Sequence, residues 1–151
     1  MGWFGYGMYD GDGTFTAQLY FLELAGISQD RIDDYYAPMK KIKLSKEDKE
    51  LFTKKLDKVI KNWKREMRKD GYNKEDTGLE YMMLGDLMIN NQIPIDLFLI
   101  ADIVVNTKLL LNEHCDDFDY PAKRKATIKR FLKKLPNVER KYPKKRLISN
   151  G

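Results

Sequence analysis

The sequence contains few of the residues on which many catalytic and metal-binding sites depend. Its 151 residues include one cysteine, Cys115, and one histidine, His114. A single cysteine excludes an intrachain disulfide and a zinc site with four cysteine ligands. No apolar run approaches the roughly 18–20 residues that a membrane-spanning helix needs, so we expect no membrane association. The first ten residues have neither the basic nor the apolar region of a secretory signal, and we therefore expect a cytoplasmic protein.

Basic residues are concentrated near the C-terminus. The chain has 28 basic and 23 acidic side chains, a net charge of +5. Residues 121–151 hold twelve of the basic side chains and one acidic side chain, a net charge of +11, which leaves −6 for residues 1–120. This asymmetry indicates contact with nucleic acid or another polyanion, unless the basic residues form only a solvated helix face and a tail that docks on the acidic body. The candidate contact residues are Lys123, Arg124, Arg130, Lys134, Arg140, Lys144, Lys145 and Arg146.

The N-terminal segment is rich in glycine and aromatic residues. Residues 1–13 contain five glycines, which favour a loop over a helix or a regular strand. The four aromatic residues of this segment are too apolar for a free tail: Trp3, Phe4, Tyr6 and Tyr9. We therefore expect a hook that is pinned into the core, with Trp3 and Phe4 as its anchors.

The rest of the sequence predicts an all-α fold, because apolar residues repeat at three- and four-residue spacing. We expect a small single-domain bundle of about five helices within residues 1–136, followed by a basic, flexible or draped tail over residues 137–151. The predicted helices cover residues 14–25, 46–69, 78–90, 94–111 and 121–135, and a short turn of helix falls near residues 29–36.

Local signals mark the predicted helix ends. Ser45 and Thr77 are expected N-caps, Gly26 is expected to end the first helix, and Pro136 the last. Residues 94–111 are apolar nearly all round, which predicts the central helix of the bundle, although the β-branched run within residues 98–105 also fits a strand. Gly85 lies inside a predicted helix, where it allows another helix to approach closely.

The opening of the sequence resembles a known family. The matching residues are Phe4, Gly5, Gly7, Tyr9, Asp10 and Asp12. They resemble a bacterial and phage domain family of unknown function whose members open with M-G-x-[WF]-G-x-G-x-[FY]-[DEN]-[ND]-D. The resemblance implies a small all-helical protein from bacteria or their mobile elements. It carries no catalytic residues that can be transferred to this chain.

Two short segments superficially fit a ligand site. Residues 10–16 alternate oxygen-bearing side chains as a calcium loop does, but Phe15 and Phe21 occupy the positions that require glycine and a bidentate acid. The same glycine-rich stretch has two aspartates and no lysine, which disfavours a phosphate loop. Residues 114–117 place His, Cys and two Asp side by side, a spacing that does not point them at one metal or pair a nucleophile with its base. We therefore predict no metal and no cofactor.

Three acidic residues lie in or beside apolar helices. Asp86 and Asp102 fit either an acid pair between two helices or separate positions at a partly wet edge, and we favour the second. Asp96 is expected to stabilise the first turn of the helix that begins at Pro94. The nearby methionines, Met82, Met83 and Met88, are expected to fill the core.

These patterns favour a non-enzymatic protein-interaction module that binds and modulates a host or phage protein. The alternative is a nucleic-acid-binding protein that contacts phosphates weakly and without sequence preference through its basic C-terminal segment. A small enzyme that uses carboxylates among Asp10, Asp12, Asp86 and Asp102 is the third hypothesis. The sequence predicts neither the partner nor the oligomeric state.

Overall fold

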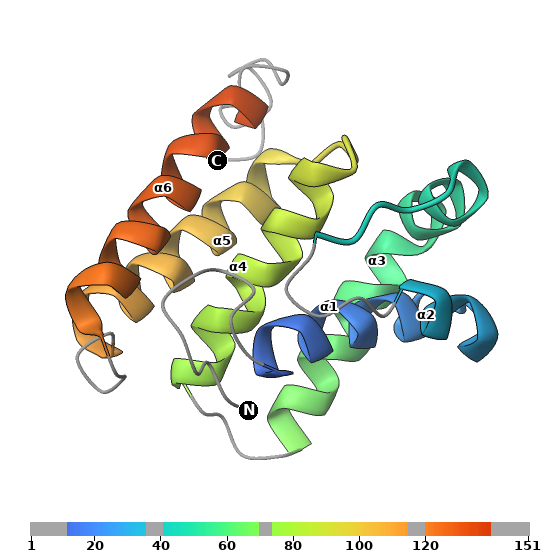
Figure 1. The fold of residues 1–151 in the computed structure, drawn as a ribbon, viewed down its shortest axis with the longest axis horizontal. Helices are drawn as coiled ribbons and strands as arrows, with labels where there is room; N and C mark the ends of the chain where they lie inside the picture. The colour runs from blue at the N-terminus through green and yellow to red at the C-terminus, as the bar shows by residue number, and fades with distance from the viewer. Residues whose placement is uncertain (1–11, 36–40, 70–73, 115–119, 140–151) are drawn as a thin grey trace.

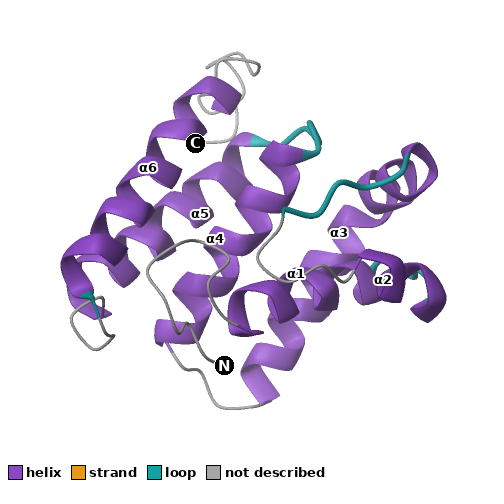
Figure 2. Ribbon diagram, in the orientation of Figure 1, coloured by secondary structure: helices purple, strands orange, loops and turns teal. Residues whose placement is uncertain are grey.

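The computed structural model of the chain describes residues 12–35, 41–69, 74–114 and 120–139. Within these ranges it contains helices and connecting segments but no strand, so the predicted all-α bundle is confirmed (Figure 1, Figure 2). The helices are α1 (Asp12–Leu24), α2 (Gln29–Tyr35), α3 (Lys46–Lys69), α4 (Lys74–Asn90), α5 (Leu97–Leu109) and α6 (Pro121–Glu139), and a π-helical turn, η1 (Leu110–His114), continues α5. None of the described helices is long and apolar enough to cross a membrane.

Local capping signals define three helix ends, of which those at Ser45 and Gly26 are predicted, whereas α5 begins at Leu97 and not at the predicted Pro94. The Oγ of Ser45, just before α3, accepts a hydrogen bond from the Asp48 N–H at 3.2 Å. Asp96 caps α5, because its carboxylate accepts a hydrogen bond from the Leu99 N–H at 2.9 Å. Gly26 follows α1 with a φ of +86°, in the left-handed region that favours glycine after a helix.

Two further predicted helix ends are wrong. α4 begins at Lys74, so Thr77 lies inside the helix instead of capping it. The buried Thr77 hydroxyl donates to the Sδ of Met67 at 3.7 Å, a tertiary contact that a capping pattern does not reveal. α6 continues through Pro136 to Glu139. A proline removes one backbone hydrogen bond, and here that loss does not end the helix.

α4, and not α5, is the central helix. From Thr77 to Met88 every residue except Glu80 is buried, and α1, α5 and α6 all pack against α4 (Figure 1). α5 leaves Phe98 and Val105 55% and 57% exposed, so the prediction of a central helix over residues 94–111 is wrong. An apolar sequence makes burial favourable on every side, but the neighbouring helices decide which sides are covered.

Gly85 allows the close approach that the sequence predicts. A Cβ at this position would lie 2.8 Å from Cζ of Phe131 on α6 and 3.3 Å from Cγ2 of Ile103 on α5. Both distances are shorter than ordinary van der Waals contact. The absence of a side chain at Gly85 therefore sets how closely two helices pack against α4.

An aromatic cluster joins α1, α3 and α4 in the core. The ring of Trp63 packs edge-to-face against Phe21 at 5.3 Å and against Tyr81 at 4.7 Å between centroids. Edge-to-face packing matches the charge distribution of aromatic rings and adds to the benefit of burial. The core also takes up three fully buried methionines, as predicted: Met82, Met83 and Met88.

Candidate interaction surfaces

The outer side of α6 carries a basic face, which we define as Lys123, Lys129, Arg130 and Lys133, all exposed. At about 100° per residue these four positions fall within roughly 120° of the helix circumference. Two of the predicted contact residues, Lys123 and Arg130, belong to this face. The other candidates beyond α6 lie outside the described residues: Arg140, Lys144, Lys145 and Arg146.

Two predicted contact residues of α6 face inward instead. Arg124 is 1% exposed, and the Nζ of Lys134 lies 3.2 Å from Oδ1 of Asp86 on α4. Arg124 occurs four residues before Ile128, on the same side of α6 as the core residues Ile128 and Phe131. This helical spacing in the sequence indicates that Arg124 is buried. The burial of Arg124 therefore removes it from the surface, whereas the side chain of Lys134 is 38% exposed and pairs with Asp86.

Asp86 is a fully buried acid that the structure compensates. Its Oδ2 accepts a hydrogen bond from Asn90 Nδ2 at 2.9 Å, and its Oδ1 pairs with Lys134. The expectation of a wet edge is wrong for Asp86, because α6 covers it. Asp102 is half exposed and pairs with Lys64 of α3 at 3.5 Å. The two acids thus have different lysine partners, which is contrary to a shared acid pair.

α5 presents an apolar stripe to the surface, which we define as Phe98, Ala101 and Val105. These positions are exposed and follow one another at spacings of three and four residues, so they lie on one side of the helix. Asp102 lies beside the stripe in its ion pair with Lys64. Isolated exposed apolar residues are common, but a row of three along one helix forms a continuous patch.

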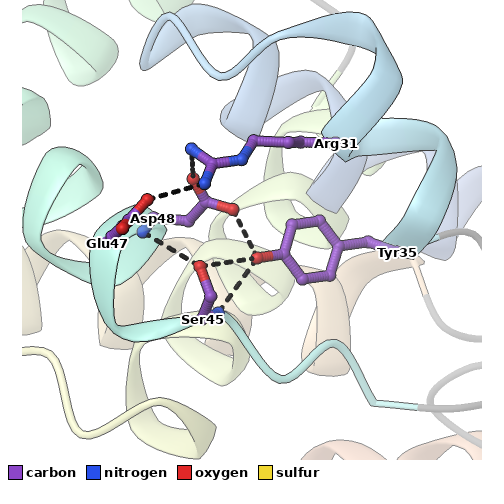
Figure 3. A network of polar contacts seen from close by, with 5 residues as sticks. All are labelled: Arg31, Tyr35, Ser45, Glu47 and Asp48. Carbon is purple, nitrogen blue, oxygen red and sulfur yellow. Dashed lines mark hydrogen bonds and ion pairs between the residues drawn. The ribbon is translucent and has the colours of Figure 1, made fainter.

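A polar network, which we call the clamp, fastens α2 to the beginning of α3 (Figure 3). The guanidinium of Arg31 lies 2.7 Å from a carboxylate oxygen of Glu47 and 3.0 Å from one of Asp48. The hydroxyl of Tyr35 donates to the other oxygen of Asp48 and accepts a hydrogen bond from the Ser45 N–H at 2.9 Å. Side chains from α2 thereby hold the capping residue and the first turn of α3.

The clamp also determines where the acids of this turn point. The hydrogen bond to Glu47 and the charge of Asp48 raise the pKa of Arg31 above its ordinary value, so this guanidinium stays charged. Asp48 is 2% exposed and faces α2. Residues 46–50 read Lys-Glu-Asp-Lys-Glu, a nearly neutral stretch. The fold pairs Glu47 and Asp48 with Arg31 and leaves the lysines on another side of α3.

Those lysines line a groove of about 520 Å³ between α3 and the segment that joins α4 to α5. We call it the lysine groove. Its lining residues are Lys46, Lys49, Glu50, Thr53 and Lys54 from α3, and Gln92 and Pro94 from the connecting segment. Its lining contains three lysines and one glutamate, so it carries a net positive charge. In the described part of the chain none of these lysines is found in an ion pair.

Asn91 fixes the two walls of the groove relative to each other. Its Oδ1 accepts a hydrogen bond from the Leu44 N–H at 2.7 Å, and its Nδ2 donates to the carbonyl oxygens of Ile42 at 3.0 Å and Leu87 at 2.8 Å. This buried amide ties the segment that leads into α3 to the C-terminal end of α4. The groove is therefore built by the fold and does not depend on a mobile loop.

Several predicted features lie outside the described residues. These are the aromatic hook of Trp3, Phe4, Tyr6 and Tyr9, together with Asp10, Cys115, Asp116 and Asp117. Asp12 is the first residue of α1, and His114 is the last of η1. Within the described ranges, no group of three or more His, Cys, Asp and Glu side chains is placed to hold a metal ion.

Comparison with known proteins yields no match. No protein-family model matches the sequence, and no curated protein and no solved structure matches it. The resemblance of the opening to a bacterial and phage family falls almost entirely on residues 1–11 and stays a prediction. Function must therefore be argued from the surfaces of the molecule.

Proposed function

We propose that the chain is a non-enzymatic module that binds another protein. In line with the resemblance of its opening, the proposed partner is a host or phage protein whose activity the module modulates. The observation that carries the proposal is the apolar stripe on α5, in which Phe98 and Val105 are each more than half exposed. Covering the exposed parts of these two side chains contributes about 2 kcal/mol to association.

The surroundings of the stripe support the same proposal. Protein interfaces combine an apolar centre with a polar, solvent-accessible rim. Along α5 the stripe is bordered by the Asp102–Lys64 ion pair and by the exposed Lys108. Ala101, between the two large side chains, permits close approach of a partner helix or loop.

The test is partner capture from a nuclease-treated extract of the source organism with the full chain. A variant with Phe98→Glu and Val105→Glu places two charges on the stripe, and we expect it to lose the captured protein. The matched control carries Thr16→Glu and Ala122→Glu, two exposed positions on α1 and α6 that receive the same charge. With the purified partner, the stripe variant should raise Kd at least tenfold while the control leaves it within about twofold. Equal binding by both variants refutes the role of the stripe.

The basic face of α6 favours a second candidate function, contact with a polyanion. Four exposed cations on one side of a helix can neutralise phosphates without reading sequence. Labelled duplex and single-stranded oligonucleotides, titrated at low and moderate salt with the full chain and with a truncation after Glu139, test this candidate. We expect weak binding that falls steeply with salt and that the truncated chain retains in part. Binding that salt leaves unchanged, or none at all, rules the candidate out.

A further inference from the structure

The lysine groove is a preorganised, positively charged site whose walls come from distant parts of the chain. The clamp turns Glu47 and Asp48 toward Arg31, so only Glu50 opposes the charge of the three lysines in the groove. Asn91 holds the opposite wall in place through hydrogen bonds to both sides of the groove. The backbone of both walls is therefore held in place before any ligand arrives.

The backbone at Gln92 adds an independent observation. Its φ of 56° lies in the left-handed region, where glycine is the residue with the least strain. The position immediately follows α4, and the Ile93 N–H donates to the Met88 carbonyl at 2.9 Å, a hydrogen-bond pattern that usually has glycine at the left-handed residue. The chain instead carries a glutamine here, and that glutamine lines the groove. Strained residues of this kind concentrate at binding sites.

We propose that the lysine groove binds an acidic peptide segment of the partner protein, an inference that rests on the proposed protein-interaction function. Lys46 and Lys54 are eight residues apart, so the charged positions spread over about 12 Å of α3. An extended peptide covers that length with about four residues. Carboxylates along such a segment match lysines that are distributed along a groove.

The same layout fits a compact phosphate less well. The groove contains no arginine, whose planar fork binds phosphate in a bidentate manner. The Thr53 hydroxyl donates to the Lys49 carbonyl at 2.7 Å, and the Asp48 N–H in the first turn of α3 is already bound by Ser45. Both donors are thus engaged within the protein, and the lysine ammonium groups remain for a ligand.

The groove also leads toward the apolar stripe. Lys54 of α3 and Pro94, three residues before α5, line the groove together, and further along α3 Lys64 meets Asp102 of α5. α3 and α5 therefore run in the same direction between these two contacts. Phe98 follows Pro94 by four residues and precedes Asp102 by four, so along the chain the stripe begins between the groove and the Lys64–Asp102 ion pair. One partner can occupy the groove with its acidic segment and the stripe with an apolar surface.

The experiment measures fluorescence anisotropy of a labelled ten-residue peptide that contains six glutamates, titrated with the full chain at 50 and 200 mM salt. The groove variant carries Lys49→Glu and Lys54→Glu. The control carries Lys58→Glu and Lys61→Glu, exposed lysines of α3 that line neither the groove nor the basic face of α6, and so has the same net charge. We expect the groove variant to lose at least tenfold in affinity and the control less than threefold. Circular dichroism and thermal unfolding confirm that both variants fold.

Three outcomes of the peptide titration overturn the proposal. The first is no binding of the glutamate peptide by the natural chain, and the second is an equal loss in both variants, which means that binding follows net charge. The third is displacement of the peptide by pyrophosphate or oligothymidylate at lower concentration than by unlabelled peptide, which assigns the groove to phosphates. If the groove variant binds the captured partner with unchanged affinity, the groove proposal is overturned but the proposed protein-binding function is not. If the stripe variant loses the partner but still binds the glutamate peptide, the result supports both the proposed protein-binding function and a separate peptide site in the groove.

Discussion

Replacement of Asp48 by alanine tests whether the clamp holds α2 against α3. The carboxylate is 2% exposed and accepts the hydroxyl of Tyr35 and the guanidinium of Arg31. A hydrogen bond to a charged acceptor contributes about 1.5–3 kcal/mol. The Arg31 side chain is 46% exposed, so solvent limits the ion pair to about 1 kcal/mol or less. We therefore expect Asp48→Ala to lower the free energy of unfolding by about 3 kcal/mol and Tm by about 6–12 °C.

A double-mutant cycle isolates the contact between the phenol and the carboxylate. Tyr35→Phe removes only the hydroxyl, and we expect it to cost about 1.5 kcal/mol. Because each single variant already loses the hydrogen bond between the Tyr35 hydroxyl and the Asp48 carboxylate, the double variant should be more stable than additivity predicts by about 1 kcal/mol. Urea unfolding of the full chain at neutral pH, followed by circular dichroism, measures all four proteins. Lys58→Ala, an exposed change on the same helix, should stay within about 0.5 kcal/mol of the natural chain.

Additive losses would refute this reasoning, since they would mean that Tyr35 and Asp48 stabilise the fold independently. A loss below about 1 kcal/mol for Asp48→Ala would also refute it, because a buried acceptor with two donors cannot be removed so cheaply. In either case the clamp would not be what orients the first turn of α3. The orientation of Glu47 and Asp48 away from the lysine groove would then need another cause.

Three further predictions concern packing, backbone and charge. Gly85→Ala gains about 1 kcal/mol of helix propensity but forces a methyl group to 2.8 Å from Phe131 Cζ. We expect a net loss of about 1 kcal/mol in chemical denaturation, and a more stable variant would contradict the packing of α6 on α4. Gln92→Gly relieves a left-handed backbone, so we expect a gain of about 0.5–1 kcal/mol, and a loss would mean that the glutamine side chain supports the fold. Exchange of Lys123 and Arg130 for glutamine should make the negative slope of log binding constant against log salt concentration less steep by about 2. An unchanged slope would contradict phosphate contact by the basic face.

The sequence predicts the parts of this fold that depend on nearby residues. The periodicity of Phe52, Val59 and Trp63 defines α3, and Ser45 caps this helix as expected, because each signal acts within one or two turns. For α2, by contrast, the sequence predicts only a short turn of helix, because seven residues give too little periodicity to define a helix.

The sequence does not predict which sides of the helices meet. Residues 94–111 carry enough apolar residues for a central helix, yet α4 takes that place, and the surplus becomes the apolar stripe. In the sequence Lys134 is one of many lysines and arginines, and only the packing of α6 on α4 shows that it pairs with Asp86. The lysine groove combines residues 46–54 with residues 92–94, and the hydrogen bonds of Asn91 that hold it bridge more than forty residues of sequence. Such pairs require the tertiary fold.

The burial of α4 has a consequence for how the molecule opens. Solvent reaches the amide hydrogens from Tyr81 to Met88 only when the helices around them separate, so these amides should exchange with deuterium at the rate of global unfolding. α2 is seven residues long and is held to α3 through the exposed side chain of Arg31 and the hydroxyl of Tyr35. Its amides should exchange through a local opening that leaves α4 intact. The amides of α4 then exchange slowly, and those of α2, beside the lysine groove, exchange faster.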